Sequence, residues 1–176
     1  MLDGGDFLLA PLQKEDAYDL NRLMSSNNER FRRFFPGTLS QNLSVTDSQR
    51  YIRDKQQLFE DREEYTLGLR DKTSNQVVGL IILKDINWHQ KRGELAYCIS
   101  PDFGGRSWTS QAVSLLSEHA LHTLGLIDLR IMVHKSNVPS VRVAEKSGFS
   151  WVKTSIESFT PPGEAALDME FYQRTK

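Results

Sequence analysis

The sequence has 176 residues, of which 39% are hydrophobic and 26% charged, so we expect one domain over residues 1–176 with a sizeable core. The 22 Lys and Arg residues nearly balance the 23 Asp and Glu residues, which excludes binding to nucleic acid or an acidic membrane through overall charge. The single cysteine, Cys98, excludes an internal disulfide, and we expect no metal site. No apolar run is long enough to span a membrane and no signal peptide is evident, so we expect a cytoplasmic protein.

Hydrophobic periodicity divides the first half of the chain into a strand, two helices and three consecutive antiparallel strands. Ala17, Leu20 and Met24 share one face of the first helix, and Thr46 or Asp47 is the expected cap of the second. In chain order these elements are residues 6–12, 13–27, 46–61, 65–70, 76–84 and 94–100.

The second half follows a different rhythm, in which helices alternate with strands. A long helix places Val113, Leu116 and Ala120 on one stripe and ends at Gly125. A strand, a long helix and a second strand make a crossover, which implies one parallel strand pair. We therefore predict an α/β (α+β) domain with a mixed, mostly antiparallel sheet flanked by helices. The elements of this half are residues 106–124, 126–133, 138–147, 149–159 and 167–174.

The segment DFGGRSWTSQAV, residues 102–113, carries two glycines and several small hydroxyl side chains at the start of the long helix. Exposed backbone N–H groups at a helix N-terminus attract anions, so the segment is a candidate phosphate cradle. It is neither G-x-G-x-x-G nor a P-loop ending in Gly-Lys-Ser/Thr, which argues against phosphoryl transfer.

Two longer segments, GELAYCISPDFGGRSWTSQAV at 93–113 and LRIMVHKSNVPSVRVAEKSGF at 129–149, resemble the GNAT superfamily of acetyl-CoA-dependent N-acetyltransferases. Within it they resemble the branch that includes the ribosomal-protein N-terminal acetyltransferases. The family's loop Q/R-x-x-G-x-G/A corresponds to residues 102–107, where Gly105 matches the central glycine and Asp102 and Ser107 differ. The motif N-x-x-S followed by RVAEKSGF reproduces Asn137 and Ser140 of this branch.

The resemblance implies a GNAT-like fold in which the parallel strands splay apart and hold the pantetheine arm of acetyl-CoA. The pyrophosphate would rest on the glycine loop, where a side chain at Gly105 would occupy the phosphate position. Arg106 would contact the phosphates or lie in solvent, Ser107 would need only an ordinary backbone conformation, and Asp102 would face away. The implied cofactor contacts are Cys98, Ile99, Gly104, Gly105, Arg106, Ser107, Trp108, Thr109, Asn137 and Ser140.

Acetylation of an amine requires that the amine lose a proton. Glu94 matches a glutamate often found in this branch and is the candidate general base, acting through water. The alternative is a structural ion pair between Glu94 and Arg92 or Lys91.

The other two requirements are a polarised thioester carbonyl and a proton for the departing thiolate. A backbone N–H near Cys98 or Ile99 is the candidate for the first. Many relatives use a tyrosine as the acid, but its position is Ala144 here, so Ser140 is the candidate. The alternative is that Asn137 and Ser140 only cap a helix.

Basic and aromatic residues near 30–35 match the part of this branch that lines the acceptor cleft. Arg32, Arg33, Phe34 and Phe35 are therefore candidate substrate contacts, or else a packed loop with solvated arginines. The implied function is direct acetyl transfer to a protein N-terminus or small amine by a monomer or homodimer. The alternative from another class is a catalytically silent, acyl-CoA-binding regulatory module.

Overall fold

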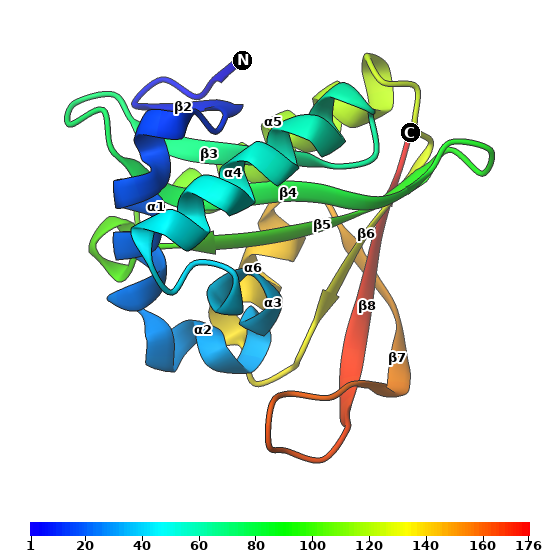
Figure 1. Ribbon diagram of the computed structural model, residues 1–176. Coiled ribbons are helices and arrows are strands. Elements are labelled where there is room, and N and C mark those ends of the chain that lie inside the picture. The colour runs from blue at the N-terminus through cyan, green and yellow to red at the C-terminus, as the bar shows by residue number, and fades with distance from the viewer.

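Eight strands form one mixed sheet with helices on both faces (Figure 1). The computed structural model describes residues 1–176. The strand order is β1-β2-β3-β4-β5-β6-β8-β7. The strands are β1 (Leu2–Asp3), β2 (Phe7–Pro11), β3 (Tyr65–Asp71), β4 (Val77–Asn87), β5 (Arg92–Ile99), β6 (Asp128–Val133), β7 (Ser150–Phe159) and β8 (Leu167–Thr175). The helices are α1 (Ala17–Ser25), α2 (Asn28–Phe34), α3 (Pro36–Ser40), α4 (Val45–Glu60), α5 (Trp108–His122) and α6 (Val138–Lys146), with short 3₁₀ turns η1 (Lys14–Asp16) and η2 (Pro101–Phe103).

The parallel pair is β5 with β6, and it is short. The two strands are paired from Arg92 opposite Asp128 to Glu94 opposite Arg130 and no further. Beyond this point β5 stays with β4 as far as Ile99, while β6 stays with β8. The strands therefore separate after Glu94, and Figure 1 shows them diverging. All other pairings are antiparallel, so the predicted mixed sheet with one splayed parallel pair is confirmed.

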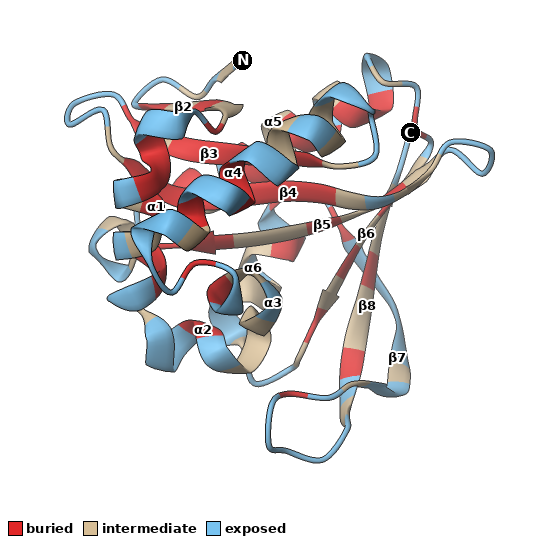
Figure 2. Ribbon diagram, viewed as in Figure 1, coloured by how far each residue is buried: buried red, intermediate tan, exposed pale blue.

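Two hydrophobic clusters, one on each face of the sheet, fix the helices. Residues Val113, Leu116 and Ala120 of α5 are buried on one face, as their spacing predicts. On the other face α1 buries Leu20 and Met24 in a cluster shared with Tyr51 and Ile52 of α4. Figure 2 shows the central strands β3 and β4 largely buried and much of the outer side of α4 exposed. None of the helices combines the length and the hydropathy that a membrane crossing requires.

Two expectations about the first half of the chain are wrong. Residues 30–35, for which one alternative is a packed loop, belong to helix α2 as far as Phe34, and α3 follows with Pro36 in its first turn. The cap of helix α4 lies two or three residues earlier than expected, because Ser44 caps the helix by accepting a hydrogen bond from the Asp47 N–H at 3.1 Å. The Ser44 hydroxyl also donates to the Asp47 carboxylate, so Asp47 supports the cap without being the cap residue.

Candidate active site

A cavity of about 1060 Å³ lies where β5 and β6 separate. Residues of both strands line it, together with the loop before α5 and the first turns of α6. Helices α2, α3 and α4 line its opposite side. The cavity therefore joins the two faces of the sheet through the opening between the strands.

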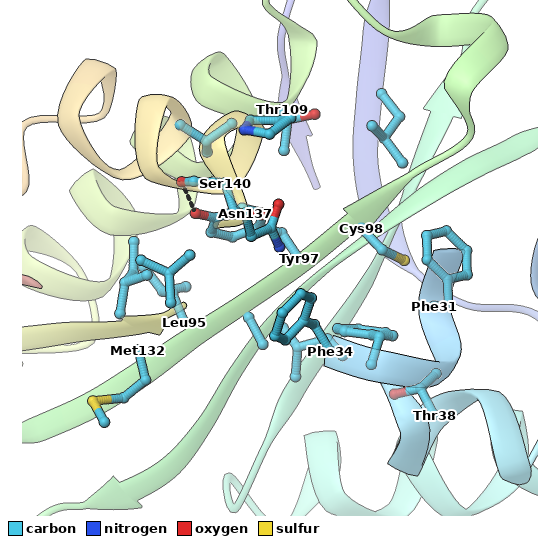
Figure 3. A pocket seen from close by; sticks show the side chains of 18 of the residues that line it. Phe31, Phe34, Thr38, Leu95, Tyr97, Cys98, Thr109, Met132, Asn137 and Ser140 are labelled. Carbon is cyan, nitrogen blue, oxygen red and sulfur yellow. Dashed lines mark hydrogen bonds between the residues drawn. The ribbon is translucent and has the colours of Figure 1, made fainter. Parts of the chain in front are cut away.

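Side-chain alternation along β5 assigns the cavity residues to two faces. Leu95 and Ile99 belong to the core cluster packed on α5, while Cys98 belongs to the cluster packed on α1 and α4. Glu94 has the same parity as Cys98 and faces the second cluster. Figure 3 shows Tyr97, Asn137 and Ser140 on one side of β5 and Cys98, with the side chains of α2 and α3, on the other. We call the α2–α3–α4 side of the cavity the acceptor chamber.

The loop between β5 and α5 presents unpaired backbone N–H groups. Gly104 N–H donates to the Pro101 carbonyl at 2.9 Å and Gln111 N–H to the Ser107 carbonyl at 3.0 Å, but the N–H groups of residues 105–110 have no acceptor in the protein. Gly105 has φ +78° and Ser107 has φ +61°. Such turns arrange successive N–H groups as an anion-binding concavity. The expectation of an ordinary backbone at Ser107 is wrong, because the chain turns sharply there to enter α5.

Aromatic side chains hold this loop on the sheet. Trp108 is buried, with its ring centroid 5.7 Å from that of Phe7 and 5.6 Å from that of Phe103. The Arg106 guanidinium lies over the Phe103 and Trp108 rings, 4.8 and 5.2 Å from their centroids. Asp102 and Arg106 are exposed and do not line the cavity, whereas Gly104, Gly105, Ser107, Trp108 and Thr109 do.

The start of α6 faces the same opening. Asn137 is the N-cap residue of α6, but its side chain makes no capping hydrogen bond. The Ser140 carbonyl accepts a hydrogen bond from the Tyr97 hydroxyl at 2.7 Å (Figure 3), while the Ser140 hydroxyl has no partner in the protein. Helix capping therefore does not account for either side chain, and both are available to a ligand.

The direction of the backbone distinguishes Cys98 from Ile99 as the candidate N–H donor to the thioester carbonyl. Ser100 N–H donates to the Val78 carbonyl at 2.8 Å, and the Cys98 carbonyl points at Gly79, where an added Cβ would lie 2.6 Å from it. Backbone groups of even-numbered residues in this part of β5 are thus directed at β4. By alternation the N–H groups of Tyr97 and Ile99 point into the opening.

The sequence model that describes the acetyltransferase (GNAT) domain matches residues 6–150, which includes both walls of the opening. This chain belongs to the GNAT acetyltransferase family. It is accordingly an acetyl-CoA-dependent acyltransferase.

Known GNAT proteins are similar to this one over most of its length. It is 27% identical over 150 residues to the "Probable N-acetyltransferase YjcK" of Bacillus subtilis (strain 168), covering 85% of this chain and 83% of the relative. It is 26% identical over 142 residues to the spermidine N(1)-acetyltransferase of Escherichia coli (strain K12), covering 81% and 72%. The solved structure of the RimL ribosomal α-N-protein acetyltransferase in complex with coenzyme A has the same fold, with a TM-score of 0.87, 16% identity and coverage of 97% and 94%.

In this GNAT acetyltransferase Glu94 lies at the point where the strands part. Its carboxylate is 2.8 Å from the Lys84 Nζ on the neighbouring strand, and both side chains are about one-third exposed or less. Burial lowers the pKa of Lys84, but its hydrogen bonds to Asp85 and Glu94 outweigh this effect and the net pKa is raised. Glu94 is therefore ion-paired, with Lys84 in place of the anticipated Arg92 or Lys91.

Cys98 is buried in the acceptor-side core. Burial raises the pKa of its thiol to about 12, with nearby Arg30 acting in the opposite sense. A thiol of this kind remains protonated at neutral pH and is a poor nucleophile.

The four acceptor-cleft candidates differ in position. Arg33, Phe34 and Phe35 line the cavity, and Arg32 lies outside it in an ion pair with Glu29. The Arg33 guanidinium forms a fork with Glu164, with distances of 2.9 and 2.8 Å, and so links α2 to the β7–β8 loop.

Sequence reasoning missed three residues of the site. Phe34 stacks on His134 with ring centroids 5.6 Å apart, across the mouth of the opening. Tyr97 ties β5 to α6, and Lys84 pairs with Glu94. Strand alternation in ELAYCIS indicates that Tyr97 and Glu94 lie on opposite faces of the sheet. The contacts of Lys84 and His134 depend on strand register and helix placement, for which the local sequence gives no signal.

Proposed function

We propose that residues 1–176 form one N-acetyltransferase domain that transfers the acetyl group of acetyl-CoA to a primary amine, by direct transfer in a ternary complex. The amine belongs to a protein N-terminus or a small molecule. One observation carries the proposal: the opening between β5 and β6 connects a surface with free N–H groups to a separate chamber on the other face of the sheet. Two substrates entering from opposite faces would meet there.

Acetyl-CoA would lie on the α5–α6 side. Its pyrophosphate would accept hydrogen bonds from the unpaired N–H groups of residues 105–110 at the positive end of α5. Its pantetheine arm would lie in the opening, where the Tyr97 and Ile99 backbones face it. Asn137 and Ser140 would then flank the thioester end, and Arg142 and Lys146, which line the same side, add positive charge for the nucleotide.

The amine would enter through the acceptor chamber past Phe34 and Phe35. Its proton would pass to Glu94 through a water molecule, and the nitrogen would attack the thioester carbonyl carbon. The Ile99 N–H would stabilise the resulting oxyanion. Collapse of the intermediate would break the C–S bond, and the nitrogen would lose its second proton to solvent. The thiolate would take a proton from the Ser140 hydroxyl, which regains one from solvent.

A screen of amine acceptors tests this function. Purified protein is mixed with acetyl-CoA and peptides, amino acids, aminoglycosides or polyamines, the last because one relative is named for spermidine. We expect free CoA to form together with one acetylated amine, and intersecting initial-velocity lines when both substrates are varied. Parallel lines would indicate an acyl-enzyme instead. Tight binding of acetyl-CoA with no turnover of any amine would contradict the proposal and favour a regulatory module.

A further inference from the structure

The charged side chains of the acceptor chamber are almost all paired with one another. Lys55 Nζ lies 2.9 Å from the Glu64 carboxylate, and both side chains are less than one-fifth exposed. Lys84 Nζ lies 2.8 Å from the Glu94 carboxylate. Glu64 and Glu94 are the only carboxylates that line the cavity. The chamber therefore offers no unpaired negative charge to a second ammonium group of a substrate.

Arg30 is the exception among the cations of the chamber. It lies on α2, lines the cavity and forms no ion pair, whereas Arg33 on the same helix is held by Glu164. Arg30 is exposed and lines the same cavity as Cys98 of β5. The unpaired charge of the chamber is thus a single cation on its wall.

A neutral hydroxyl adds to this arrangement. Tyr51 lines the cavity, and its buried hydroxyl, beside the Thr38 and Thr66 side chains, is the one buried side-chain polar atom in the protein without a hydrogen-bond partner. Burial raises its pKa, so the group stays protonated near neutral pH and supplies no negative charge. Tyr51 therefore adds no charge that would favour a second ammonium group in the chamber.

We infer that the acceptor is an amine with a carboxylate close to the nitrogen, and that Arg30 recognises this carboxylate. The inference rests on the proposed acetyl transfer to an amine. A carboxylate would neutralise the one unpaired cation of the chamber, whereas a polyamine would bring further positive charge against Lys55, Lys84 and Arg30. Free α-amino acids and peptides with an acidic first residue share this chemistry.

Matched acceptors test the inference and separate its two sources. The first arm compares the common amino acids with their α-amides, the second compares peptide amides that begin with Asp or Asn, and spermidine is the polycation. We expect kcat/KM for the carboxylate-bearing member of one arm to exceed that of its neutral partner and of spermidine by about tenfold or more. The arm in which the preference occurs identifies the source.

The variant Arg30→Gln connects the preference to this residue. We expect it to lower kcat/KM for the preferred acceptor about tenfold, mainly through KM, and to remove the preference over the neutral partner. Acetyl-CoA affinity should not change. The control is Arg53→Gln on α4, which removes an arginine that is exposed, unpaired and outside the cavity.

Two results would overturn the inference while leaving the proposed function intact. One is acetylation of spermidine or neutral amines as efficiently as carboxylate-bearing amines, and the other is an Arg30→Gln variant with an unchanged preference. Absence of turnover with every amine, despite bound acetyl-CoA, would contradict the proposed function and this inference together.

Discussion

Gly105 offers a sharp test of the proposed phosphate site, because the chain contains a matched control. Gly105 has φ +78° and Gly163 has φ +75°, and an added Cβ at either position would meet no protein atom within 4 Å. Of these two glycines, only Gly105 lines the cavity. Replacing either glycine by Leu therefore imposes the same left-handed strain, about 1–2 kcal/mol, and differs only in what the new side chain does to a bound ligand.

The expected loss of affinity follows from the N–H groups of residues 105–110. A leucine side chain at 105 would displace the pyrophosphate from at least one of these donors, and a hydrogen bond to a charged group contributes about 1.5–3 kcal/mol. We expect Gly105→Leu to weaken acetyl-CoA binding about 10- to 100-fold. Gly163→Leu should leave the affinity unchanged.

Isothermal titration calorimetry measures the two dissociation constants, and thermal unfolding reports the strain. Both variants should lose about 2–8 °C in Tm, since each carries the same backbone cost. Equal acetyl-CoA affinity for Gly105→Leu and Gly163→Leu would refute the phosphate site at this loop. A much larger fall in Tm for Gly105→Leu alone would show that the loop has a structural role that the open space around Gly105 does not explain.

Three further predictions follow from individual contacts. Ser140→Ala should lower turnover roughly tenfold and keep acetyl-CoA affinity within a few-fold, because only the unpartnered hydroxyl is lost; full activity in steady-state assays would remove Ser140 from the mechanism. Cys98, with its pKa raised to about 12 by burial, should resist iodoacetamide at pH 8 until urea unfolds the protein; mass spectrometry showing rapid native labelling would contradict this. Arg70→Met should lower the free energy of unfolding in urea by about 3–5 kcal/mol, because it leaves the buried Asp16 carboxylate, 2.7 Å from the Arg70 guanidinium, without its ion-pair partner. A decrease below about 1 kcal/mol would contradict a stabilising role of this ion pair.

Periodic patterns were sufficient for most of the fold. The stripe of Val113, Leu116 and Ala120 predicted the buried face of α5, and the strand–helix–strand order predicted the parallel pair. Helices α2 and α3 escaped prediction because seven- and five-residue helices carry too few turns for a period to show. Tertiary contacts, such as Phe31 in the core beside α1, stabilise them instead.

The candidate site was harder to predict, because it depends on register and backbone direction. Glu94 was identified from a motif, yet its ion-pair partner is Lys84, ten residues earlier in the chain and adjacent only through the β4–β5 pairing. Ser107 has a positive φ that the serine side chain does not signal. The pairing of Arg33 with Glu164 joins residues 131 positions apart, and only the folded chain reveals it.

The central claim is that Glu94 removes the proton of an amine at the opening between the strands, and the pH dependence of turnover in Glu94→Gln tests it most directly. The matched control is Asp85→Asn. The Asp85 carboxylate is the other partner of Lys84, 2.6 Å from its Nζ, and Asp85 does not line the cavity. We predict that Glu94→Gln lowers kcat about 100-fold at pH 7, recovers part of the loss as rising pH deprotonates the amine, and binds acetyl-CoA normally, while Asp85→Asn stays close to wild type. Wild-type turnover in Glu94→Gln, or an equal loss in both variants, would contradict the claim.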